Sequence, residues 1–150
     1  MTFQEHTTPE KLERYSFLWS EARLVIASVA LFLGGVPPVM ALNPIPAFYN
    51  LISSLLTLCW IVSGVAAGYL LYRWHTGGKT LFHEKRQHDT IAFFVMVVSG
   101  LNLGLAGLIS TNIGMSISSN RLILTIVGAL YLIAAYYLHK RWHASGQKMF

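Results

Sequence analysis

From Leu24 to Tyr72 the chain contains no Asp, Glu, Lys, Arg or His, a run of 49 residues. Two shorter runs of the same kind extend from Thr90 to Asn120 and from Leu122 to Leu138. The hydrocarbon core of a bilayer is crossed by roughly 20 apolar helical residues. The first run is therefore long enough for two spans and their connection, and the others hold one span each. We predict a single all-α integral membrane domain over residues 1–150, with four transmembrane helices near 23–42, 48–72, 90–111 and 121–139.

A soluble four-helix bundle is the alternative, and the composition argues against it. Only 11% of the residues are charged, whereas soluble proteins carry about 25%. Helices on the surface of a soluble domain also show a polar face every turn or two, and these segments do not.

The N-terminal residues resemble the start of a helix rather than a cleaved signal peptide, since no basic segment directly precedes a short apolar one. Thr7, Thr8, Pro9 and Glu10 combine a hydroxyl cap, a proline in the first turn and an acidic residue three positions after Thr7. Apolar residues then follow at helical spacing. We expect an amphipathic helix over 9–22 that either lies at the membrane interface or runs straight into the first span.

The basic residues are distributed unequally between the two sides that these spans define. Arg121 alone lies on one side. The other side holds Lys11, Arg14, Arg23, Arg73, Lys79, Lys85, Arg86, Lys140, Arg141 and Lys148. Basic residues accumulate on the cytoplasmic side of membrane proteins, so we expect both termini in the cytoplasm, in a plasma or inner membrane. This strong bias argues against an antiparallel homodimer. The cytoplasmic charge is either a topology signal or a patch for anionic lipids, and nothing else favours nucleic-acid binding.

An internal repeat is the most informative pattern. Residues 69–82 and 137–150 are identical at seven of fourteen positions at an offset of 68, including Arg-Trp-His at Arg73, Trp74 and His75 and again at Arg141, Trp142 and His143. We predict two parallel two-helix repeats, about 9–82 and 83–150, related by an axis along the membrane normal.

Each Arg-Trp-His motif follows the end of a span. Arg and His are favoured at the negative end of a helix dipole, and Trp anchors the interface. The motif is either such an anchor, used twice, or half of a paired binding site. The same offset maps Glu21 onto Asp89, and these are candidate ion-pair partners for Arg73 and Arg141.

Small and amide side chains within the spans form the second set of candidate residues. Gly64 and Gly68, and Gly100 and Gly104, have the spacing that lets membrane helices approach closely. Asn102, between the last two, either lines a pore or forms an interhelical hydrogen bond. The three runs that hold the spans contain no acidic or basic residue. We therefore expect no proton-coupled or metal-dependent chemistry inside the membrane.

Prolines interrupt the first span on the side opposite the termini. Pro37 and Pro38 follow two glycines, and Asn43 to Pro46 forms the connection. Proline removes a backbone donor and disfavours helix just before it, so the first span should end early or kink. Non-helical backbone at membrane depth is tolerated where it is buried in protein or lines a cavity. These residues therefore mark either a vestibule or an ordinary surface loop.

No arrangement for catalysis or cofactor binding is visible. The single Cys59 cannot form an internal disulfide, and the histidines lack the tight spacing of a zinc site. We therefore expect no enzyme activity, cofactor or metal. The sequence favours a parallel homo-oligomer, joined through its glycine faces, that acts as a channel- or transport-like assembly. An accessory or scaffolding subunit of a larger membrane complex is the alternative.

The topology is testable by cysteine accessibility in a Cys59→Ser background. His75→Cys and His143→Cys should both react with an impermeant thiol reagent from the cytoplasmic side only, and Ser119→Cys from the other side only. Reaction of positions 75 and 143 from opposite sides would exclude a parallel repeat.

Overall fold

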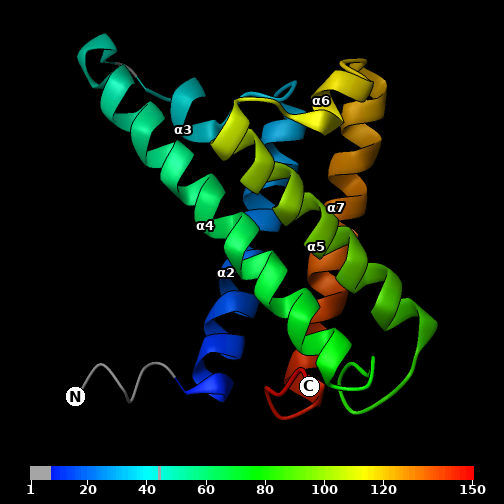
Figure 1. Cartoon of the computed structure of the whole chain (residues 1–150). Helices are drawn as coiled ribbons and strands as arrows, with labels where there is room; N and C mark the ends of the chain where they lie inside the picture. The colour runs from blue at the N-terminus through cyan, green and yellow to red at the C-terminus, as the bar shows by residue number, and fades with distance from the viewer. Residues whose placement is uncertain (1–7, 44) are drawn as a thin grey trace.

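The computed structural model describes residues 8–43 and 45–150, and within these ranges it contains helices and no strand. Four long helices form a bundle (Figure 1): α2 (Pro9–Phe32), α4 (Tyr49–Thr76), α5 (Gln87–Ile109) and α7 (Arg121–Ala144). The connections hold the short helices α3 (Pro38–Ala41), η1 (Pro46–Phe48) and α6 (Ile113–Ile117). All four long helices are long and apolar enough to cross a membrane. The prediction of four apolar helices of spanning length is therefore confirmed, although the first runs from Pro9 to Phe32 instead of near 23–42.

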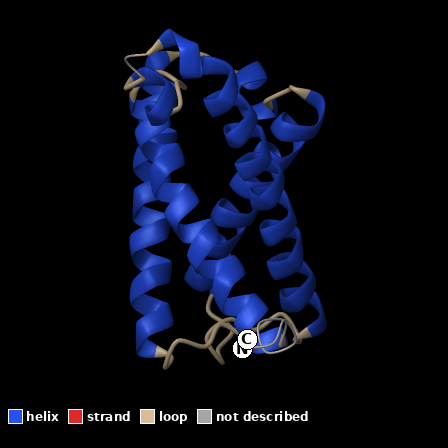
Figure 2. Cartoon of the chain, turned by 90° about the vertical axis from the view of Figure 1, so that its left-hand side faces the viewer, coloured by secondary structure: helices blue, strands red, loops and turns tan. Residues whose placement is uncertain are grey.

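The bundle has two chemically different ends (Figure 2). Residue 8, the 77–86 connection and residues 145–150 lie at one end, here called the basic end because nine of the eleven Lys and Arg residues lie in or next to it. The opposite, distal end carries residues 33–48 and 110–120, with α3 and α6. This grouping matches the sorting of charges predicted from the sequence, except at Arg23.

Helix α2 is continuous from Pro9 to Phe32, so residues 9–22 are its first half rather than a separate interfacial helix. Thr8 is the N-cap residue and Pro9 occupies the first turn, where its missing N–H costs nothing; Thr7 lies outside the described residues. Glu13, Phe17 and Ser20 are buried. The first half of α2 thus packs into the bundle, which is the second of the two predicted alternatives.

The first span ends earlier than the predicted residue 42. Gly34 and Gly35 have positive φ angles of 82° and 90°, a conformation that glycine adopts without strain. Pro37 precedes the single turn of α3. The helix therefore ends at the two glycines, before Pro37, and it is not kinked by the prolines; Pro44 lies outside the described residues.

The main cluster of buried apolar side chains lies in the half of the bundle near the basic end. Its buried apolar residues come from all four long helices and from both chain segments that follow α4 and α7. They are Phe17, Leu24, Ala67, Leu70, Leu81, Phe82, Ala92, Phe93, Met96, Val97, Ala134, Ala135, Leu138, Trp142 and Met149. Many large apolar side chains elsewhere are exposed, including Leu55, Leu58 and Val65 of α4, as expected of a surface that faces lipid.

The glycines predicted to allow close packing join α4 to α5. A Cβ atom on Gly104 would lie 2.6 Å from the Cα atom of Gly64, and a Cβ on Gly100 would lie 2.7 Å from the Cβ of Ala67. Gly68 differs, since a Cβ there would meet nothing within 4 Å. Gly64, Gly100 and Gly104 are thus used within one chain. The expectation that these glycine faces join copies of the protein is therefore wrong for these three residues.

This packing predicts opposite outcomes for two similar substitutions. Gly104→Ala should lower the free energy of unfolding by about 1–3 kcal/mol, because the added methyl group forces the two backbones apart. Gly68→Ala is the matched control and should be neutral or slightly stabilising, because alanine favours helix and the space is open. Thermal unfolding in detergent measures both, and equal effects would contradict the α4–α5 contact.

Candidate binding cavity

A cavity of about 840 Å³ lies between the four long helices in the distal half of the bundle. Its walls are mainly apolar and include Val25, Ala30, Leu56, Leu103 and Val127. The cavity begins where the packed interior ends. Its volume lies within the range of roughly 300–1,000 Å³ that is usual for small-molecule sites.

The floor of the cavity, toward the basic end, is polar. Arg23 of α2 reaches across to α5, where Nη1 donates to the Ser99 hydroxyl at 2.9 Å and Nη2 donates to the Met96 carbonyl at 2.8 Å. Trp19 Nε1 donates to the Ser63 hydroxyl at 3.0 Å, and Ser63 donates to the Cys59 carbonyl. Arg23 is only 7% exposed. A buried cation thus lines an otherwise apolar cavity.

Arg23 corrects the sequence-based expectation that no charged residue lies deep in the spans. Arg23 was expected at the boundary of the first span, because the uncharged run begins only at Leu24. Since α2 begins at Pro9, Arg23 lies in the second half of a 24-residue helix. The helix-start signal at Thr8 and Pro9 could have located it there.

The distal end of the cavity is formed by the segments that contain α3 and α6. Asn102 donates to the Asn112 side chain at 2.9 Å and accepts from the Gly114 N–H at 3.3 Å. Asn102 therefore holds the connection around α6 by hydrogen bonds to that connection rather than to another span, and it also lines the cavity. Pro37 and Pro38 line the same cavity, as expected for irregular backbone at membrane depth.

The cavity also opens sideways, between helices. Ile26 of α2 lines it and is 58% exposed, and Cys59 of α4 lines it and is exposed as well. Both residues belong to helices of spanning length. The opening therefore lies along the apolar stretch of the long helices, between the two ends of the bundle.

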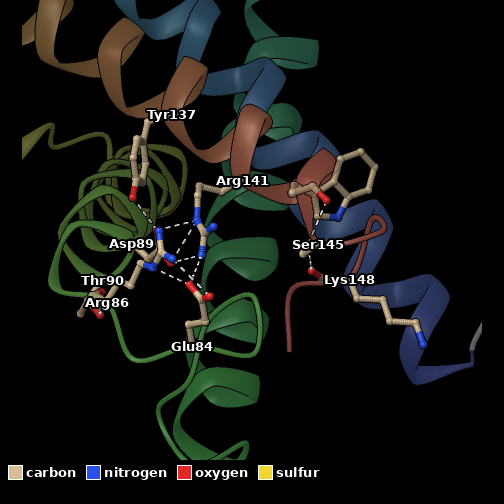
Figure 3. A network of polar contacts seen from close by, with 9 residues as sticks. Glu84, Arg86, Asp89, Thr90, Tyr137, Arg141, Ser145 and Lys148 are labelled. Carbon is tan, nitrogen blue, oxygen red and sulfur yellow. Dashed lines mark hydrogen bonds and ion pairs between the residues drawn. The ribbon is translucent and has the colours of Figure 1, made fainter.

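The two arginines of the repeated motif lie at the basic end, neither lines the cavity, and each binds an acidic residue. Figure 3 shows the contacts of Arg141. Arg141 donates to Asp89 through Nε at 3.0 Å and Nη2 at 2.9 Å, and Nη2 also reaches Glu84 at 2.7 Å. Tyr137 donates its hydroxyl proton to Asp89 at 2.6 Å. The predicted pair of Arg141 with Asp89 is confirmed.

The partner of Arg73 differs from the expectation. Arg73 Nη2 lies 3.1 Å from Glu13, which also accepts from the backbone N–H groups of Met149 and Phe150. Glu21 instead lies 2.7 Å from His139. Glu13 was missed because the offset of 68 residues that aligns α4 with α7 maps Asp89 onto Glu21. The first helices of the two repeats, α2 and α5, do not align at that offset.

The remaining motif residues divide into packed tryptophans and exposed histidines. Trp142 contacts Phe17 with ring centroids 5.3 Å apart, and Trp74 contacts Phe93 at 6.1 Å. His75 and His143 are both exposed, and no cluster of three metal-ligating side chains occurs in the described part of the chain. The two tryptophans of the motifs therefore pack into the interior of the bundle, and the two histidines lie on its surface.

Helices α4 and α7 end in the same way. Gly77 N–H donates to the Arg73 carbonyl and Lys79 N–H to the Trp74 carbonyl; 68 residues later, Ser145 donates to Arg141 and Gln147 to Trp142. Gly78 and Gly146, also 68 apart, have positive φ angles of 78° and 70°. These are helix C-caps in which glycine takes the left-handed conformation.

Comparison with protein-family models, with curated protein sequences and with solved structures found no match.

Asp89 and Glu84 both bind Arg141, but removing Asp89 should destabilise the protein much more than removing Glu84. Asp89→Ala should lower the free energy of unfolding by about 3 kcal/mol, because Asp89 is fully buried and its removal leaves Arg141 and Tyr137 without their shared acceptor. Glu84→Ala should cost less than about 1 kcal/mol, because the Glu84 side chain is 43% exposed. Unfolding in detergent compares them, and equal losses would show that the cluster is not a buried ion pair.

Proposed function

We propose that the protein is a small integral membrane protein that takes up an apolar small molecule from the bilayer into its distal cavity, as a carrier or transport-like protein does. The observation that supports this most is the cavity itself: about 840 Å³, apolar-walled and lined by exposed Ile26 and Cys59 of two helices of spanning length. An opening at that height gives access from the hydrocarbon rather than from water.

A permanently open channel through one chain fits the packing less well. Between the floor of the cavity and the basic end, the interior is filled by large buried side chains such as Phe17, Leu70, Phe93 and Leu138. Passage of a solute to the basic end therefore requires this half of the bundle to open. Since Gly64, Gly100 and Gly104 face one another within the chain, a parallel homo-oligomer would use lipid-facing surfaces such as Leu51 and Leu58 of α4.

The proposed topology has both termini in the cytoplasm and the cavity in the outer half of the membrane. The supporting observation is the concentration of Lys and Arg at the basic end, with Arg121 alone at the distal end. We also propose that the chain arose by duplication of a helix pair. The matched caps of α4 and α7 support it, as do the pairs Arg73–Glu13 and Arg141–Asp89, in which each second helix binds the first helix of its own unit.

Cys59, the single cysteine, provides a direct test of ligand uptake. An apolar compound that enters the cavity should slow the reaction of Cys59 with a membrane-permeant maleimide, because the thiol lies in the cavity wall. The panel holds neutral apolar probes, among them a fatty alcohol, a fatty acid methyl ester and a quinone. At least one of them should slow labelling about tenfold at saturation, because only molecules with an empty cavity then react.

The control moves the thiol by one residue. In Cys59→Ser/Leu58→Cys the thiol replaces an exposed side chain that does not line the cavity. Labelling at position 58 should not respond to the same compound. Equal protection at both positions would mean that the compound only changes the bilayer, and no protection at Cys59 by any probe would argue against the proposed function.

A further inference from the structure

We infer that the molecule bound in the cavity is an amphiphile with one anionic headgroup, and that Arg23 is the residue that binds the headgroup. This inference rests on the proposed function and specifies its ligand. It starts from the chemistry of a single side chain at the cavity floor.

Arg23 is a buried cation that has no ion pair with any acidic residue in the described part of the chain. A guanidinium has five N–H donors, and the hydrogen bonds to Ser99 and Met96 use two of them. The Nε atom is buried without an acceptor among the described residues. Nη1 and Nη2 each keep one further N–H beyond those that bind Ser99 and Met96, so Arg23, which lines the cavity, retains its charge and two Nη donors.

The other buried charges among the described residues are neutralised. Asp89 is bound by Arg141, and Glu13 by Arg73. Burial of a charge costs free energy unless it is paired, and charged residues within membrane spans are uncommon outside functional sites. An anion in the cavity would supply the counter-charge that the chain itself does not provide at Arg23.

The chemistry of the guanidinium selects the class of anion. Its planar fork binds carboxylate and phosphate oxygens through charge-assisted hydrogen bonds. The walls above it, which include Ala30, Leu56 and Val127, are apolar, so the rest of the ligand must be apolar too. A free fatty acid and a single-chain phosphate lipid share this chemistry, and the experiment below separates them.

The competing explanation is that Arg23 only ties α2 to α5. Its two hydrogen bonds do connect these helices, and Gly100 leaves room for it, since a Cβ there would lie 3.3 Å from Nη2. A purely structural arginine would affect stability but would not distinguish an anionic ligand from its neutral ester. That difference makes headgroup selectivity the decisive readout.

The test measures binding to the full-length protein in phosphatidylcholine nanodiscs by native mass spectrometry. Three probes share one oleoyl chain: oleate, methyl oleate and oleoyl lysophosphatidate. The wild-type protein should bind oleate or lysophosphatidate about 10- to 100-fold more tightly than methyl oleate. This is the gain in affinity expected from one hydrogen bond to a charged group. The tighter of the two anions identifies carboxylate or phosphate as the preferred headgroup.

Arg23→Gln should remove this preference while methyl oleate binds as before, because glutamine retains polar groups but no charge. Arg121→Gln is the matched control, since Arg121 is exposed at the distal end and does not line the cavity. It should leave the preference intact. Loss of selectivity in both variants would indicate general attraction of anions and would overturn the inference.

The remaining outcomes separate the two proposals. Equal binding of all three probes by the wild-type protein overturns the role of Arg23 but leaves the cavity as an apolar site. Binding of none overturns both. Should Arg23→Gln not fold, Arg23→Lys keeps the charge but loses the fork, and it should reduce the preference by a smaller factor.

Discussion

The contact between Gly64 of α4 and Gly104 of α5 determines how the rest of the bundle is arranged. Two glycines allow the helix backbones to touch where any side chain would hold them apart. Gly100, one turn from Gly104, leaves the space beside α5 that the Arg23 guanidinium enters. Gly100 and Gly104 of α5 thus have two effects. They let α4 and α5 approach closely, and they make room for Arg23 to reach from α2 to α5.

The interior of the protein is divided into a filled half and a hollow half. Near the basic end, aromatic and aliphatic side chains fill the space, and the acidic residues Glu13 and Asp89 are bound by arginines. Beyond Arg23 the side chains no longer fill the space between the helices, and a cavity remains. A well-packed half gives the fold its stability, so the distal half is free to bind a ligand.

Much of this architecture could be predicted from the sequence, because the bilayer limits what an uncharged chain can do. The run from Leu24 to Tyr72 requires helices, and the glycine spacing indicates close packing. Which helices pack together could not be predicted, since Gly64 and Gly100 are compatible with a partner in the same chain or in another. The ion pair of Arg141 with Asp89 was anticipated, but Glu13 was not, because the repeat is weak in the first helix of each unit.

The cavity was only partly predictable, for a physical reason. Pro37, Pro38 and Asn102 were candidates from their residue types, and all three line it. Arg23 was assigned to the membrane surface because arginine next to an apolar run usually lies there. Its true depth depends on the length of helix that precedes it and on the Ser99 and Met96 acceptors of α5, 73 or more residues away in the chain. Such long-range acceptors leave no local signal.

If ligands enter the cavity in the distal half and bind at the guanidinium of Arg23, a bound molecule should be visible there in an experimental structure determined in a lipid nanodisc. We predict elongated density between α2, α4, α5 and α7, with its compact end at Arg23. A distal half in which α2 and α4 close together and their side chains fill the space, or in which Arg23 binds a carboxylate of its own chain, would contradict the account.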